Sequence, residues 1–89
     1  MVNLPFEQER VDHSTVVRTF SASVPDEELK WHRDHEDRLV RPLEETDWQL
    51  QLDDELPKRF VGEVMIPKGV YHRLIKGSGD LKVEVKMLS

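Results

Sequence analysis

The part of this chain with the most chemically capable side chains is a short polar stretch at residues 31–38. It reads Trp31-His32-Arg33-Asp34-His35-Glu36-Asp37-Arg38. Successive side chains of an extended strand point to opposite faces. One face would therefore carry His32, Asp34, Glu36 and Arg38. An imidazole oriented by a carboxylate can act as a general acid or base, and a guanidinium on the same face can pair with a carboxylate as a buried salt bridge.

The register of this stretch decides which residues face inward. A shift by one residue moves every side chain of a strand to the other face. The alternative inner set would then be Arg33, His35 and Asp37.

His72 is a further reactive side chain, and it follows a predicted bend. Val64-Met65-Ile66 is a short apolar run, Pro67 fixes φ and removes a backbone donor, and Gly69 permits a φ that other residues resist. The chain then becomes extended again. This pattern predicts a strand, a tight turn and a second strand that holds His72 on a β surface.

The elements that must position these side chains are predicted to be strands. Residues 48–52 alternate between apolar and polar, and residues 81–87 place a charge between each pair of apolar side chains. Thr15 to Ser23 is rich in strand-forming residues. About seven short strands separated by turns predict an all-β sandwich or barrel. Gly77-Ser78-Gly79-Asp80 is predicted to be a hairpin loop.

Size and composition limit the classes of function. The chain has 89 residues, of which 37% are hydrophobic and 35% charged, so we expect one compact domain. Residues 1–13 would form an N-terminal arm that adds an edge strand or reaches a neighbouring subunit, and residues 14–89 the barrel domain. A net charge of −5 argues against nucleic acid as a partner.

The sequence also predicts where the protein works. No stretch approaches the roughly 20 apolar residues that a membrane span needs, so we expect no membrane association. There is no cysteine, which excludes disulfides and thiolate metal sites. These features, with an N-terminus that lacks a secretory signal, predict a cytoplasmic protein.

The motifs resemble those of the cupin superfamily, whose members are small β-barrels of jelly-roll topology. The second cupin motif is Gly followed by Pro-x-Gly-x-x-His, and Gly62, Pro67, Gly69 and His72 match it with one residue fewer in the first gap. The first motif, His-x-His followed by Glu, aligns with His32, Asp34 and Arg38. The likeness spans roughly residues 29 to 87. The sequences of two segments, residues 31–34 and 67–73, also resemble those of short cupin-like proteins from marine phages and ocean samples.

The resemblance implies a metal site. In cupins the side chains of both motifs converge on iron, manganese, zinc or nickel. Carried over by position, the ligands here would be His32, Asp34 and His72, with Arg38 where the family has a carboxylate ligand. Two histidines and one carboxylate suit iron(II) or manganese(II) and leave coordination positions open. In the shifted register, His35 and Asp37 become the candidates.

These observations predict a small cupin-like jelly-roll barrel that binds a small molecule, with or without a divalent metal. The predicted pocket is lined by His32, Asp34, Arg38 and His72. The alternative function is that of a metal-dependent enzyme, an oxygenase, isomerase or lyase that acts on a small acid or sugar. We also expect a homodimer, because so small a barrel gains by covering an edge strand.

Overall fold

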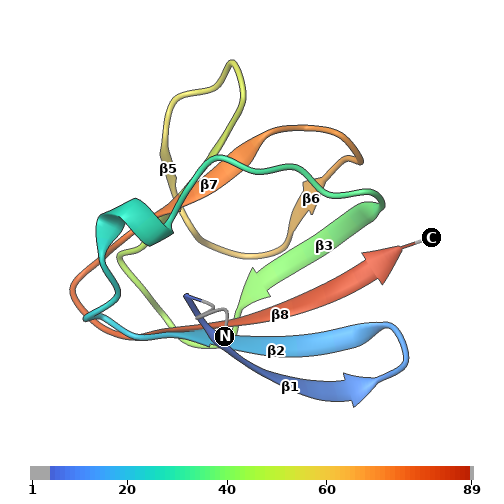
Figure 1. Ribbon diagram of the computed structural model, residues 1–89, viewed down its shortest axis with the longest axis horizontal. Coiled ribbons are helices and arrows are strands. Elements are labelled where there is room, and N and C mark those ends of the chain that lie inside the picture. Colours follow the sequence, from blue (N-terminus) through green and yellow to red (C-terminus); the bar gives the residue numbers. More distant parts are fainter. Residues whose placement is uncertain (1–4, 89) are drawn as a thin grey trace.

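The computed structural model describes residues 5–88, which form eight β-strands and one short 3-10 helix. The elements are β1 (Glu7–Asp12), β2 (Thr15–Phe20), η1 (Asp26–Glu28), β3 (Asp37–Pro42), β4 (Gln49–Leu52), β5 (Lys58–Arg59), β6 (Val64–Ile66), β7 (His72–Ile75) and β8 (Leu81–Leu88). The strands make two antiparallel sheets, with the orders β1-β2-β8-β3-β6 and β5-β4-β7 (Figure 1). The prediction of an all-β protein is confirmed.

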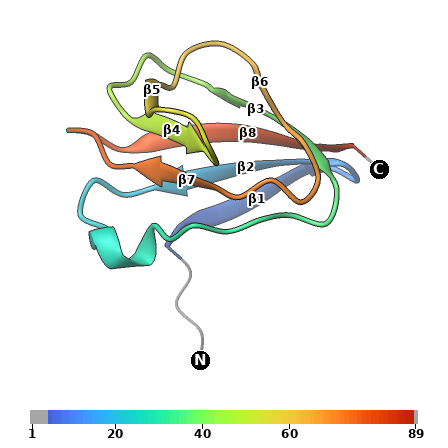
Figure 2. The same ribbon diagram turned by 90° about the horizontal axis from the view of Figure 1, so that it is seen from above.

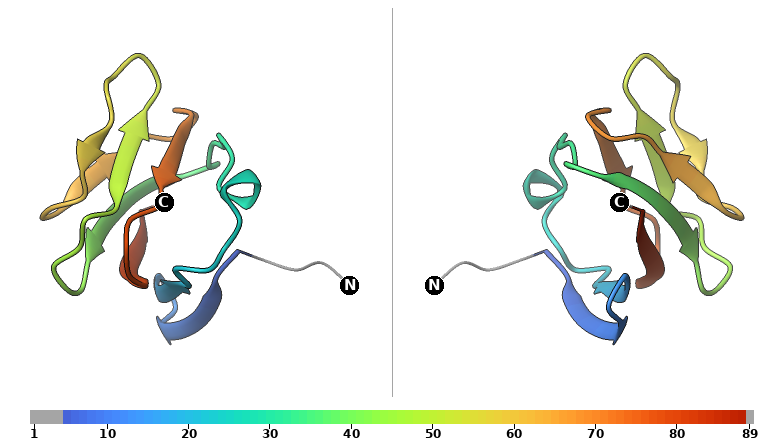
Figure 3. Two further views of the ribbon diagram at one scale, coloured as in Figure 1. Left: turned by 90° about the vertical axis from the view of Figure 1, so that its left-hand side faces the viewer. Right: turned by 90° about the vertical axis from the view of Figure 1, so that its right-hand side faces the viewer.

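The two sheets face each other and enclose the core (Figure 3). The predicted alternation in β8 is confirmed, since Leu81, Val83 and Val85 are buried. Leu50 of β4 and Trp48, which directly precedes β4, point into the same interior, and Trp48 is fully buried. Burying a large apolar side chain contributes roughly 1.5–3 kcal/mol, so period-two patterning is enough to drive the sheets together.

The prediction of a hairpin at residues 77–80 is wrong. β7 pairs with β4 in the smaller sheet, whereas β8 pairs with β2 and β3 in the larger one. The loop instead crosses between the sheets and is held against the start of β4. The Ser78 amide donates to Asp47 Oδ1 at 2.9 Å, and Trp48 Nε1 donates to the Gly79 carbonyl at 2.6 Å.

The predicted bend at residues 67–70 is present and also joins the two sheets, because β6 and β7 belong to different ones. The Val70 amide bonds to the Pro67 carbonyl at 3.2 Å. Gly69 has a φ of 81°, in the left-handed region that favours glycine. The bend therefore turns the chain from the larger sheet into the smaller one just before His72.

The N-terminal arm and the polar stretch at residues 31–38 also take a defined place in the fold. Residues 7–12 of the predicted arm form β1 at the edge of the larger sheet (Figure 2); residues 1–4 and Ser89 lie outside the described part. The polar stretch becomes a regular strand only at Asp37, where β3 begins. Before it, residues 29–36 form an extended strap that leads from η1 past β7. Among residues 5–88, no helix is long and apolar enough to cross a membrane.

Candidate metal centre

Backbone hydrogen bonds bring the strap to the start of β7. The His32 amide donates to the His72 carbonyl at 3.0 Å, and the His72 amide donates to the His32 carbonyl at 2.9 Å. The Gly69 amide also donates to the Asp34 carbonyl at 3.0 Å. Residues directly opposite each other in an antiparallel pair share a face, so both imidazoles point to the same side. Their ring centroids lie 4.2 Å apart.

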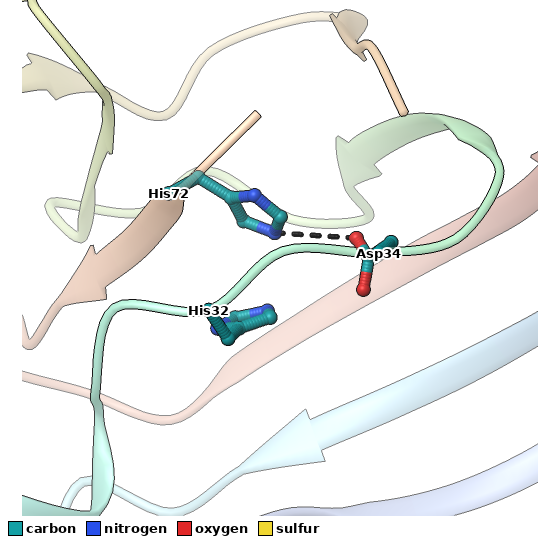
Figure 4. A group of neighbouring side chains, drawn as sticks. All are labelled: His32, Asp34 and His72. Atoms are coloured by element: carbon teal, nitrogen blue, oxygen red, sulfur yellow. Dashed lines mark ion pairs between the residues drawn. The ribbon is translucent and has the colours of Figure 1, made fainter. Parts of the chain in front are cut away.

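Three of the predicted site residues converge at this point (Figure 4). One ligand atom each from His32, Asp34 and His72 lies within 4.8 Å of the other two. Asp34 and His72 are buried, at 9% and 5% exposure, whereas His32 is exposed. The alternation assumed for a strand therefore continues along the strap, although only one pair of its residues bridges to β7.

Both imidazoles are held in the same tautomer. His72 Nδ1 lies 2.9 Å from the Val70 carbonyl, and His32 Nδ1 lies 3.1 Å from the Lys30 carbonyl. Because a carbonyl oxygen only accepts, Nδ1 carries the hydrogen in each ring. Nε2 of a neutral ring then carries a free lone pair. Metal-binding histidines are commonly held in this way, with the other ring nitrogen donating to a carbonyl or carboxylate. Burial, together with the charges of His32 and Arg38, lowers the pKa of His72 by more than the Val70 carbonyl and the Asp34 carboxylate raise it, which favours the neutral ring.

The geometry between Asp34 and His72 fits a cation. His72 Nε2 and Asp34 Oδ2 lie 3.4 Å apart, and buried Oδ2 has no hydrogen-bond partner among the described residues. Two acceptors therefore face each other, an arrangement that a positive charge between them would stabilise. Ligand atoms about 2.1 Å from one metal are at most about 4.2 Å apart, so a separation of 4.8 Å needs only a small closure. The residues fit a divalent metal.

Arg38 contributes to the site without being a ligand. Its Nη1 lies 3.2 Å from Asp34 Oδ1, and its Nη2 lies 3.1 Å from Glu36 Oε1. The guanidinium thus takes one oxygen of Asp34 and leaves the other turned toward His72. A positive charge beside the three ligand atoms weakens cation binding, but the same ion pair fixes the orientation of the Asp34 carboxylate.

The cluster lies in the wall of a cavity between the sheets. The cavity has a volume of about 370 Å³, within the range of small-molecule sites. All four predicted pocket residues line it: His32, Asp34, Arg38 and His72. Much of the remaining lining is apolar core, including Leu50, Phe60 and Val85. The cavity therefore combines an apolar interior with one polar wall.

The shifted-register candidates are not brought into this cluster. His35 and Asp37 are both exposed, and neither lines the cavity. Asp37 instead accepts the Lys68 amide at 2.7 Å, which anchors the bend between the sheets.

Sequence reasoning missed Arg18, which lines the cavity from β2. The available signal was alternation: Val16 and Phe20 are buried, so the residue midway between them shares their face. A charged side chain on that otherwise apolar face indicates a polar part of the cavity lining.

No family model matches the chain, and no curated protein matches its sequence. Solved structures are similar to it. A cupin domain from Bordetella pertussis Tohama I has 18% identity and a TM-score of 0.61, covering 100% of this chain and 99% of that one. A putative mannose-6-phosphate isomerase from Ralstonia eutropha JMP134 has 13% identity and a TM-score of 0.64, covering 94% and 83%.

Hydroxypropylphosphonic acid epoxidase from S. wedmorenis is also similar, with 21% identity and a TM-score of 0.61. The match covers 83% of this chain but only 42% of the epoxidase. At these identities the comparisons establish the fold alone. The two antiparallel sheets match cupin jelly-roll structures, which confirms the predicted fold class.

Proposed function

We propose that this protein binds a small molecule in the cavity between its sheets, with a divalent metal held by His32, Asp34 and His72. The observation that carries the proposal is the pairing of His72 Nε2 with Asp34 Oδ2, two acceptors 3.4 Å apart in a buried site. Two imidazoles and one carboxylate suit iron(II) or manganese(II) and leave positions open for a ligand. A metal bound there would supply Lewis-acid attraction for an oxygen of that ligand.

The chain's own residues would do the rest of the binding. The apolar interior excludes water from most of the ligand, and the polar wall fixes its orientation. The Val70 and Lys30 carbonyls hold both Nε2 atoms toward the cluster, and Arg38 holds Asp34. Such outer partners keep a site organised before its ligand arrives.

Metal titration tests the proposal. Protein stripped with a chelator should bind one Mn²⁺ per chain by calorimetry, and metal analysis of the untreated protein should find a bound transition metal. His32→Ala and His72→Ala should each abolish this binding. His35→Ala is the matched control, because His35 is an exposed histidine on the same strap. Mn²⁺ binding that survives both ligand substitutions would refute the proposed metal site.

A metal-dependent enzyme is the second candidate, an oxygenase, isomerase or lyase acting on a small acid or sugar. It is supported by the open positions that such a ligand set leaves, and by an epoxidase and a putative isomerase among the similar structures. Binding is the preferred function because Asp34 and Glu28 are the carboxylates lining the cavity, and Glu28 is exposed. Among residues 5–88, no buried carboxylate or imidazole beyond the cluster therefore lines the cavity. Turnover of a bound small acid or sugar would favour the enzyme.

A further inference from the structure

Arg18 brings a second guanidinium to the cavity, from the larger sheet. It lies on β2, where Val16 and Phe20 on the same face are buried. Its Cζ lies 4.4 Å from the centre of the Phe6 ring, and its Nε donates to Gln8 Oε1 at 2.9 Å. The cation–π contact and the Nε hydrogen bond hold the head group in place, and neither terminal nitrogen is used by that hydrogen bond.

The charge of Arg18 has no direct partner in the described part of the chain. No carboxylate there lies within 4.0 Å of it, and residues 1–4 are Met, Val, Asn and Leu, which bear no acidic side chain. The carboxylates that act on it from a distance are Asp34 and Glu36, and both are already paired with Arg38. Burial and the charge of Arg38 lower the pKa of Arg18. A half-buried arginine is rarely left without an anion.

Arg38 also has hydrogen-bonding capacity that the described residues do not satisfy. Its Nε is buried without a hydrogen-bond partner among residues 5–88, although both terminal nitrogens are paired. The charges of the two arginines offset those of Asp34 and Glu36. Lys30 and Glu28, which also line the cavity, offset each other, so a divalent cation on the three ligands would leave an excess of two positive charges.

We propose that the ligand of this cavity is a small organic anion whose carboxylate or phosphonate group binds Arg18 beside the metal cluster. The inference rests on the proposed function, because it takes the cavity to be the ligand site. Guanidinium groups bind such oxyanions through two parallel hydrogen bonds, which gives both affinity and orientation. The cavity volume of about 370 Å³ restricts the ligand to a small molecule.

Calorimetry with three probes tests this inference. Lactate and methylphosphonate are the anions, and lactamide is the neutral analogue of lactate. Each is titrated into Mn²⁺-loaded protein and into protein kept in EDTA. We expect the anions to bind and lactamide to bind at least about tenfold more weakly.

Variants then assign the effect to Arg18. Arg18→Gln should weaken the binding of both anions about tenfold or more, and Arg18→Lys should retain part of it. Lys82→Gln is the matched control, because it removes the same charge from an exposed position on β8. If Arg18→Gln does not fold, the comparison of lactate with lactamide in the unaltered protein decides.

Several results would overturn the inference. These are anion affinity unchanged in a folded Arg18→Gln, lactamide bound as tightly as lactate, or no anion binding up to about 10 mM. The two proposals fail separately. If Mn²⁺ binding depends on His32 but anion binding does not depend on Arg18, only the proposal of an anionic ligand is refuted. Arg18-dependent anion binding in EDTA, with Mn²⁺ binding that survives both His32→Ala and His72→Ala, refutes only the proposed metal site.

Discussion

At the scale of single residues, the site depends on which atoms carry protons. His72 donates from Nδ1 to a backbone carbonyl and turns a bare Nε2 toward the free oxygen of Asp34. Arg38 occupies the other oxygen. Each side chain therefore has one contact that orients it and one atom left for a ligand. This division of roles explains why a buried carboxylate oxygen can remain without a hydrogen bond.

The depressed pKa of His72 predicts a pH dependence of stability in the metal-free protein. Between the folded pKa and the unfolded value of about 6.5, the unfolded chain binds more protons than the folded chain. The contribution to stability is therefore complete above about pH 6.5 and is lost as the pH falls below it. The loss is at most about 1.4 kcal/mol per pH unit. Urea unfolding in EDTA at pH 7.5 and 5.5 measures it.

His72→Gln should flatten this dependence, whereas His35→Gln should leave it unchanged because that side chain is exposed. Equal slopes in all three proteins would contradict the assignment. The aspartates with lowered pKa values, Asp12 and Asp47, titrate at more acidic pH and do not contribute in this window.

At the scale of elements, the strap is held to β7 from both faces. Inside the cavity lies the histidine pair. On the outer face, the Arg73 guanidinium lies 4.9 Å from the Trp31 ring centre, and the Arg33 guanidinium lies 5.3 Å from the Tyr71 ring centre. These pairs flank the bridge between His32 and His72. They compensate for the short hydrogen-bonded ladder, because His32–His72 is the one backbone bridge between the strap and β7 among residues 5–88.

We therefore predict that Trp31→Ala weakens Mn²⁺ binding although Trp31 is not one of the three proposed ligands. A cation–π pair at an exposed site is worth about 0.5–1 kcal/mol, so the affinity should fall about two- to fivefold. Leu56→Ala is the control, since Leu56 is exposed on a loop far along the chain. The measurement is Mn²⁺ calorimetry on folded protein. An unchanged affinity would mean that the outer pairs do not position His32.

The crossover loop between β7 and β8 gives a second test at this scale. A Cβ added at Gly77 would collide with the Asp47 carboxylate and lie 2.8 Å from the Trp48 backbone nitrogen. At Gly79 it would meet nothing within 4 Å. Gly77→Ala should therefore destabilise the protein by about 1–3 kcal/mol, and Gly79→Ala should not. Urea unfolding compares the two variants. Similar losses in both would show that the loop relaxes freely.

At the scale of the whole molecule, the sheet edges decide how chains associate. β1 exposes charged side chains along its edge, which protects an edge from pairing. β6 forms the opposite edge of the same sheet and exposes Met65. We predict a homodimer that covers β6, seen by light scattering as twice the mass of one 89-residue chain.

Met65→Lys should shift this dimer toward monomer, because it places a charge on the covered edge. Val11→Lys is the matched control on β1, where the side chain is also exposed. A monomer at every protein concentration would refute the dimer. A dimer that only Val11→Lys disrupts would place the contact on β1 instead.

The sequence allowed the faces of the strands to be predicted better than their partners. Alternation correctly placed Trp48, Leu50 and Val83 in the core, because burial follows side-chain direction. It could not distinguish a hairpin from a crossover at residues 77–80, since pairing depends on contacts with distant segments such as Asp47. The cluster of His32, Asp34 and His72 followed from motif resemblance. Arg18 was missed because one charge within an apolar strand reads as a surface residue.

The bridge between His32 and His72 has a consequence for how the fold is secured. A cation shared by the two imidazoles would tie together positions about 40 residues apart in a chain that has no cysteine. By the loop-closure estimate used for disulfides, such a tie contributes about 4 kcal/mol. The ion would then act as a reversible cross-link, and the lifetime of the folded chain would depend on the concentration of free metal.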